Sequence, residues 1–200
     1  MKIFEVGVMR TGTTSLGRAY EILGFNHRGC NHVLNNKFNK ERDYNMLFNV
    51  IDKYDAFQDV PWQSIDVQIL DKKYPGSKFI LLERDDESWI RSLEYWSSPA
   101  LNKDWEEWIE PDRALVDERW VIDRDNIIKG SLKWKYSKYE KIKEYFKNRP
   151  DDLLVMNICG GEGWEVLCSF LNISIPRVGL NVSFPKVNVW ASNFDINDIY

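Results

Sequence analysis

The alternation of apolar and polar residues along the chain predicts strands separated by helices. Apolar runs typical of strands occur at residues 2–8, 25–30, 56–59, 78–83 and 153–158. Helical spacing of apolar residues occurs at residues 13–23, 65–74, 86–96 and 162–171. Strands that alternate with helices favour a parallel sheet covered on both faces. The pattern therefore predicts an α/β fold with three layers, αβα, around a central parallel sheet.

Charged and aromatic residues are interleaved over residues 103–147, unlike the rest of the chain. This pattern predicts two or three helices with solvated faces, which we expect to form a helical cap over the sheet. Residues 172–200 have no clear period and are expected to be irregular. With 200 residues, of which 44% are hydrophobic, the chain is long enough for one domain, and we expect a single domain over residues 1–200.

Charge and cysteine usage limit the partners and the compartment. The formal net charge of −4 disfavours nucleic acid or an anionic membrane as a partner. Neither a signal-peptide pattern nor an apolar stretch long enough to span a membrane is expected from the sequence. Cys30, Cys159 and Cys168 are too far apart for a close-spaced metal motif, which favours free thiols in a reducing compartment. We therefore expect a cytoplasmic protein.

The segment GVMRTGTT, residues 7–14, lies between a predicted strand and a predicted helix, which is the context of a phosphate-binding loop. Gly12 allows the backbone to approach an anion closely, and the N–H groups at the start of the helix would point toward it. Thr11 belongs to the same loop, and hydroxyl groups follow at Thr13, Thr14 and Ser15. The alternative is an ordinary helix start, in which a glycine turn is capped by threonine.

The loop lacks one residue that a triphosphate site needs. Its spacing matches a Walker A motif, but the lysine position holds Thr13. Since that lysine stabilises the β- and γ-phosphates, ATP hydrolysis is disfavoured. The cation is instead Arg10, two residues before the glycine, where it could reach a 5′-phosphate and the oxygen that bridges it to the next group. The loop therefore favours a nucleotide with a short 5′ end.

A second phosphate site is predicted after the strand at residues 78–83. Arg84 follows this strand, and Ser92 lies eight residues later on the next predicted helix. An arginine fork and a hydroxyl donor could hold a phosphate together. Taken singly, Arg84 could be a surface ion-pair partner and Ser92 a residue without a special role. Together with the loop, they indicate a nucleotide that carries phosphates at two ends.

At these residues the sequence resembles the sulfotransferases that use 3′-phosphoadenosine 5′-phosphosulfate (PAPS). The segment RTGTTS, residues 10–15, is similar to their 5′-phosphosulfate loop, and Arg84 with Ser92 is similar to their 3′-phosphate motif. Further stretches typical of the soluble members recur in the same order, so that the resemblance covers nearly the whole chain. These stretches are DVPW, KYPGSKFILLERDDESWIRSL, YFKNRPDDLLVMNI, GWEVLCSFL and FPKVN.

The resemblance implies a P-loop fold and transfer of a sulfuryl group from PAPS to a hydroxyl or amine of a small-molecule or carbohydrate acceptor, with PAP as product and no metal. Two departures concern the donor site. Many cytosolic members have a tryptophan against the adenine where this chain has Ser15. Their C-terminal Arg-Lys-Gly segment has no clear counterpart here, and Lys186 is a weak substitute.

Two residues compete for the role of general base. Asp59 lies where cytosolic members have the histidine that takes the acceptor proton, and an aspartate can act as base if burial raises its pKa. The alternative is an aspartate that only forms the turn before a proline. His32, near the end of the second predicted strand, is the alternative. A metal site formed by His27, Cys30 and His32 would lack a fourth ligand. Two other functions remain open, a non-catalytic protein that binds a 3′,5′-bisphosphonucleotide and a small-molecule kinase.

Overall fold

Five parallel strands form the centre of the protein. The computed structural model describes residues 1–96, 111–176 and 183–187. Its strands, which are adjacent in the order β2-β3-β1-β4-β5, are β1 (Ile3–Glu5), β2 (His27–Arg28), β3 (Ala56–Phe57), β4 (Lys78–Leu82) and β5 (Leu153–Met156). The predicted α/β class and the central parallel sheet are thus confirmed.

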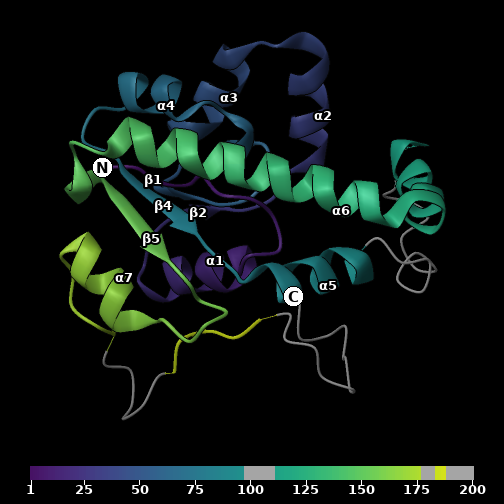
Figure 1. The fold of residues 1–200 in the computed structure, drawn as a ribbon. Helices are drawn as coiled ribbons and strands as arrows, with labels where there is room; N and C mark the ends of the chain where they lie inside the picture. Colours follow the sequence, from purple (N-terminus) through teal and green to yellow (C-terminus); the bar gives the residue numbers. More distant parts are fainter. Residues whose placement is uncertain (97–110, 177–182, 188–200) are drawn as a thin grey trace.

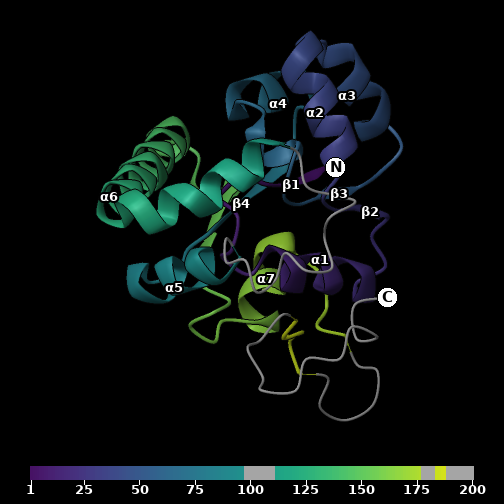
Figure 2. The same cartoon turned by 90° about the vertical axis from the view of Figure 1, so that its right-hand side faces the viewer.

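Helices cover both faces of the sheet (Figure 1). One face carries α1 (Thr13–Ile22) and α7 (Trp164–Leu171). The other carries α2 (His32–Glu41), α3 (Tyr44–Ile51), α4 (Val67–Lys73) and α6 (Pro111–Phe146). Figure 2 shows the two groups on opposite sides of the strands, with α5 (Asp86–Trp96) beside α6. Two short 3₁₀ turns, η1 (Trp62–Ser64) and η3 (Pro150–Asp152), complete the described elements.

Side chains of each central strand alternate between two apolar cores. Phe4 stacks between Phe57 and Phe79, with ring centroids 5.1 Å and 5.8 Å away, on the face covered by α2 to α4 and α6. Ile3 and Ile80 pack on the opposite face against α1 and α7. Because successive side chains of a strand point to opposite faces, a strand buried on both sides must be apolar throughout. This explains the uninterrupted apolar run of β4.

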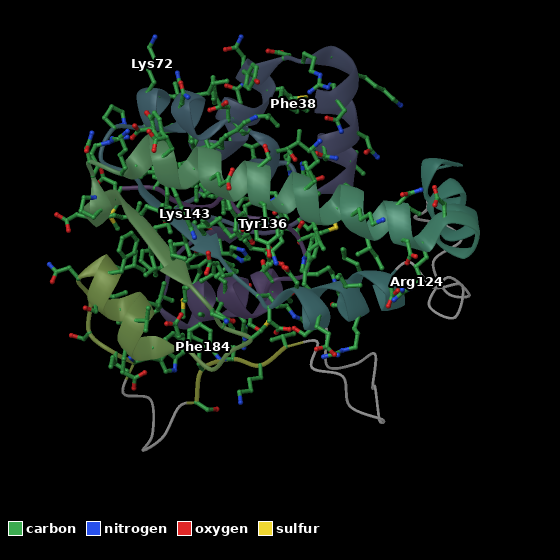
Figure 3. All side chains as sticks on the ribbon, in the orientation of Figure 1. Phe38, Lys72, Arg124, Tyr136, Lys143 and Phe184 are labelled. Carbon is green, nitrogen blue, oxygen red and sulfur yellow. The ribbon has the colours of Figure 1, made fainter. Side chains whose placement is uncertain are left out.

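The helix α6 crosses the face of the sheet and is bonded to the end of β4. The hydroxyl of Tyr139 donates to the carbonyl of Leu82 at 2.5 Å, and Lys143 forms an ion pair with Glu83 at 2.6 Å. Figure 3 labels Lys143 on the side of α6 that faces β4 and β5. Asp123 has non-helical dihedral angles and divides α6 into two segments, whereas residues 103–110 of the predicted cap lie outside the described residues. Within the described part of the chain, no helix combines the length and apolar character of a membrane span.

The order of the strands determines where their loops lie. Since all pairs are parallel, β1, β3 and β4 end at the same edge of the sheet, and β1 lies between the other two. The loops that follow these three strands therefore meet at one place, as ligand sites of parallel sheets commonly do. The helices α2 and α3 were not predicted; the side chains of Asn31 and Asp43 cap them by accepting the N–H groups of Leu34 and Asn45.

Candidate functional site

The loop between β1 and α1 adopts the backbone that an anion site needs. Arg10 and Gly12 both have left-handed conformations, with φ angles of 67° and 104°. A Cβ atom at Gly12 would lie 3.2 Å from the Cβ of Ile158, so that only glycine fits there without displacement. No described side chain caps the N-terminus of α1, and its first turn holds no acidic residue. The positive end of the helix dipole is thus not offset by an acidic side chain of the first turn.

A cavity of about 430 Å³ opens in front of this loop. It collects side chains from the loop, from the turns after β2, β3 and β5, from the end of β4 and from α5. Its predicted site residues are Arg10, Gly12, Thr13, Thr14, Ser15, His32, Asp59, Arg84 and Ser92. Thr11 does not line it, because its side chain is fully buried and its hydroxyl donates to the carbonyl of Val8 at 2.7 Å.

The two predicted arginines are joined to each other at the cavity wall. Arg84 Nη1 donates to the carbonyl of Arg10 at 2.9 Å, and Arg84 Nε donates to Ser88 Oγ at 2.8 Å. Arg10 Nε donates to the oxygen of Ser92 at 3.0 Å. Ser92, which was expected to act together with Arg84, therefore contacts Arg10. Arg84 instead contacts Ser88. The sequence did not single out Ser88, although it lies one helical turn before Ser92.

Asp59 stands at the cavity in a turn that directly follows β3. Its φ angle of 66° is left-handed, a conformation that aspartate tolerates better than most residues. Oδ1 accepts the N–H of Val60 at 2.9 Å and the side-chain amide of Gln63 at 3.2 Å, and Oδ2 accepts the hydroxyl of Thr13 at 3.3 Å. Burial raises the pKa of the Asp59 carboxyl, while the N–H of Val60 and the nearby charges of His32 and Arg10 oppose this shift. A carboxyl with a raised pKa suits proton transfer.

His32 also lines the cavity, as the first residue of α2, but it is exposed. Its Nε2 lies 3.3 Å from Cys30 Sγ. His27 lies elsewhere, with Nδ1 3.5 Å from a carboxylate oxygen of Glu21. His32 and Cys30 therefore contact each other, whereas His27, the third residue of the possible metal site, contacts Glu21. Across residues 1–96, 111–176 and 183–187, no group of three or more His, Cys, Asp or Glu residues is arranged to hold a metal ion.

The segment 183–187 closes one side of the cavity. Ser15 Oγ accepts the N–H of Val187 at 3.0 Å, which brings Lys186 to the cavity wall. Phe184 packs against Trp164 of α7 with ring centroids 4.8 Å apart, and Figure 3 labels it beside the lower end of α7. Ser15 thus anchors the segment that carries Lys186.

The cavity combines a helix N-terminus, two arginines and a partly buried carboxylate. A model of the sulfotransferase domain matches residues 2–193. The chain belongs to the sulfotransferase domain family. It is also similar to "Ava biosynthesis cluster protein M" of Aspergillus versicolor, with 26% identity over 213 residues that cover 88% of this chain and 78% of that protein. The resemblance found in the sequence is confirmed, and the sulfotransferase domain extends over nearly the whole chain.

The conformation of Gly12 leads to a stability prediction. Gly12→Ala places a Cβ atom in a left-handed backbone and against Ile158, so we expect it to lower the free energy of unfolding by roughly 1–3 kcal/mol. Gly130→Ala is the matched control, because Gly130 lies inside α6 and a Cβ there meets nothing within 4 Å. It should raise the free energy of unfolding by about 0.5–1 kcal/mol. Urea unfolding followed by tryptophan fluorescence measures both, and equal effects would contradict the prediction.

Proposed function

We propose that this sulfotransferase domain transfers the sulfuryl group of PAPS to an acceptor hydroxyl or amine. Membership of the sulfotransferase family supports sulfuryl transfer in general. The observation that carries the choice of donor is the cavity in which Arg10 and Arg84 lie together with the N-terminus of α1. Two cations and a helix N-terminus on one wall suit a ligand with two anionic ends.

The residues around the cavity fit this donor. The N–H groups of α1 and the hydroxyl of Thr14 would hold the 5′-phosphosulfate together with Arg10, while Thr13 donates its hydroxyl proton to Asp59. Arg84 would hold the 3′-phosphate, since its bonds to Ser88 and to the carbonyl of Arg10 use only two of its guanidinium N–H groups. Ser92 can donate its hydroxyl proton to the same phosphate while it accepts from Arg10.

PAPS supplies a sulfuryl group whose bond to the 5′-phosphate oxygen breaks as the acceptor oxygen or nitrogen bonds to sulfur. Asp59 accepts the proton that the acceptor loses, and its raised pKa favours this transfer near neutral pH. Arg10 and the N–H groups of the loop stabilise the charge that develops on the leaving phosphate oxygen. His32 is the alternative base on the same cavity.

The acceptor is proposed to be a small molecule or a carbohydrate, and no metal is assigned to the reaction. The Aspergillus versicolor relative is named for a biosynthesis cluster, which favours a small molecule. The net charge of −4 gives no reason to propose a nucleic-acid or membrane partner. A cytoplasmic location is proposed from the cysteine content.

Calorimetry tests the donor. We expect PAP to bind without metal, and ATP with magnesium to bind more weakly, because the loop lacks the Walker lysine. Arg84→Ala should weaken PAP binding about ten- to a hundredfold, the loss of roughly 1.5–3 kcal/mol from a charge-assisted contact. Adenosine 5′-phosphosulfate, which has no 3′-phosphate, should lose no comparable affinity. Arg91→Ala is the control, since Arg91 lies on α5, the helix that follows Arg84, and pairs with the exposed Glu87.

Tighter binding of ATP with magnesium than of PAP would favour a kinase and contradict the proposal. Equal losses of PAP and adenosine 5′-phosphosulfate in Arg84→Ala would show that Arg84 does not bind the 3′-phosphate. PAP binding without sulfuryl transfer to any member of a broad acceptor panel would favour the non-catalytic binding protein.

The base is tested by Asp59→Asn, which keeps the shape of the side chain but cannot accept the proton. Turnover should fall roughly a hundred- to ten-thousandfold while PAP affinity stays near that of the wild type. Wild-type turnover should rise with pH through the raised pKa of Asp59, and the variant should lack this rise. His32→Gln serves as the comparison. If His32→Gln abolishes turnover and Asp59→Asn does not, the two roles are exchanged.

A further inference from the structure

A second cavity, of about 730 Å³, lies between α6 and the segment formed by η1 and the start of α4. Both views of the ribbon show α6 next to α4 on the same side of the sheet (Figures 1 and 2). Met9 and Val60 line both this cavity and the cavity of about 430 Å³ that is proposed to bind PAPS, hereafter the donor cavity. Their sequence neighbours Arg10 and Asp59 line only the donor cavity. The two cavities therefore adjoin next to the proposed base.

Gln63 connects the two cavities chemically. It lines the second cavity, and its side-chain amide donates to Asp59 Oδ1 at 3.2 Å. A molecule in the second cavity whose hydroxyl lies at the boundary formed by Met9 and Val60 would present that hydroxyl toward Asp59. An acceptor hydroxyl must lie this close to Asp59 for the carboxylate to accept its proton.

The walls of the second cavity are mainly apolar. Ile65, Val67 and Ile142 lie on them, and Trp134 adds an indole ring that is 49% exposed. Such a surface suits an apolar ring system far better than a carbohydrate, whose hydroxyls would lose hydrogen bonds to water.

Three of the four charged side chains that line this cavity are bound to other groups of the protein, and one of the three is Lys138, which donates to two backbone carbonyls. Asp66 is occupied as the cap of α4, where it accepts the N–H of Gln68, and Glu144 forms an ion pair with Lys147. Lys141 is exposed and forms no ion pair with the side chains that the structure describes. An acceptor with a negative group beside Lys141 would form an ion pair with it.

We propose that the second cavity binds the acceptor, and that the acceptor is a hydroxyl compound with an apolar ring system and an anionic substituent. This inference rests on the proposed sulfuryl transfer. Trp134 would stack on the ring, Lys141 would pair with the anion, and Asp59 would take the proton of the hydroxyl.

The probes are 2-naphthol, 6-hydroxy-2-naphthoate and glucose. Calorimetry on the protein saturated with PAP should show binding of both naphthols, with 6-hydroxy-2-naphthoate the tighter, and no binding of glucose. Trp134→Ala should weaken both naphthols roughly tenfold and leave PAP affinity unchanged. Lys141→Gln should weaken only 6-hydroxy-2-naphthoate, by about three- to tenfold, and Lys133→Gln, which changes another exposed lysine of α6, should weaken neither. The same order should appear in the KM values for PAPS-dependent turnover.

Failure of the two proposals is distinguishable. Normal PAP binding with no binding of either naphthol, or with naphthol binding that Trp134→Ala does not change, would overturn the acceptor site alone. Transfer to glucose but not to the naphthols would overturn the acceptor class. Absence of PAP binding would overturn the donor proposal, and the acceptor proposal with it.

A separate observation concerns a carboxylate beneath the phosphate loop. Glu5, at the end of β1, is 0% exposed. Its Oε1 accepts the N–H of Gly7 at 2.6 Å, and its Oε2 accepts the N–H of Asp59 at 3.2 Å. Lys138 of α6 donates to the carbonyl of Gly7 and to the carbonyl of Gln63, both at 2.6 Å. The residue Gly7 is thus held on its N–H by an acid and on its carbonyl by a lysine.

We propose that Glu5 is a positioning residue, which holds the phosphate loop and the Asp59 turn at one spacing through its two hydrogen bonds. Only the ionised carboxylate can accept both N–H groups without turning its own proton toward one of them. The protonated form, and likewise a glutamine, would face one N–H group with a donor. The Asp59 turn should therefore be held best when Glu5 is ionised.

The surroundings of Glu5 put this ionisation near neutral pH. Burial raises the pKa of Glu5 to about 7, with Lys138 opposing the shift and Asp59 adding to it. The other titratable groups that face Glu5 are the hydroxyls of Tyr20 on α1 and Tyr139 on α6, whose pKa values lie above their usual range because of burial. Asp59 in turn faces His32 and Arg10.

Glu5→Gln tests the proposal through a pH profile. Above about pH 8, turnover should fall roughly ten- to a hundredfold, because small displacements of a catalytic group have effects of this size. Below about pH 6, where wild-type Glu5 is protonated, the variant and the wild type should differ little. PAP affinity should change by less than about threefold. Glu83→Gln is the control, because Glu83 also binds a lysine of α6 but is only partly buried and forms its ion pair away from both loops.

Stability supplies a readout that does not depend on turnover. The pKa of Glu5 is higher in the folded protein than its ordinary value of 4.5, so the folded state holds this proton more tightly. Between pH 4.5 and about 7 the wild type should therefore lose stability relative to Glu5→Gln as the pH rises. If Glu5→Gln leaves Lys138 uncompensated and does not fold, the double variant Glu5→Gln/Lys138→Met removes both charges. Its free energy of unfolding should show the pH dependence that is expected for Glu5→Gln. A loss of turnover that is equal at all pH values, or no loss at all, would overturn the positioning role.

Discussion

The loop between β1 and α1 leads into the N-terminus of α1 without regular secondary structure, so its backbone conformation depends on contacts with other elements. Buried backbone groups of such a loop still need hydrogen-bond partners. Side chains from distant elements supply them. Trp89 of α5 donates to the carbonyl of Met9 at 2.9 Å, and Arg84 donates to the carbonyl of Arg10. The conformation of this loop therefore depends on residues that follow much later in the chain.

The same requirement connects α6 to the donor cavity. Lys135, which is almost fully buried, donates to the carbonyl of Arg84 and to Asp86 at 2.8 Å, while Lys138 donates to the carbonyl of Gly7. Lys135 also lies 4.8 Å from the ring centroid of Trp89. One helix thus contacts the backbone at both predicted phosphate sites and forms a wall of the second cavity. Movement of α6 would displace both cavities together.

The sequence predicted the parts of this arrangement that depend on local patterns. Helix α5 has the predicted bounds, and the loop of residues 7–14 follows a buried strand and precedes a helix as expected. The role of Glu5 could not be found in this way, because a single acid in an apolar strand resembles the normal alternation of a strand. Its partners become apparent only when β3 is placed beside β1, which brings Asp59 next to it. Ser88 was missed for a similar reason, since the bond to Arg84 depends on the exact path of the chain between β4 and α5.

The two departures from other sulfotransferases have a common structural basis. Where many members have a tryptophan, Ser15 offers a hydroxyl small enough to accept the N–H of Val187. At the other end of the same segment, Phe184 packs on Trp164, and a Cβ atom at Gly163 would lie 3.0 Å from the Cβ of Phe184. The segment is thereby fixed at both ends, with Lys186 at the cavity wall between them. A larger residue at position 15 would displace this segment together with Lys186. Ser15 and Lys186 therefore act together in closing one side of the donor cavity.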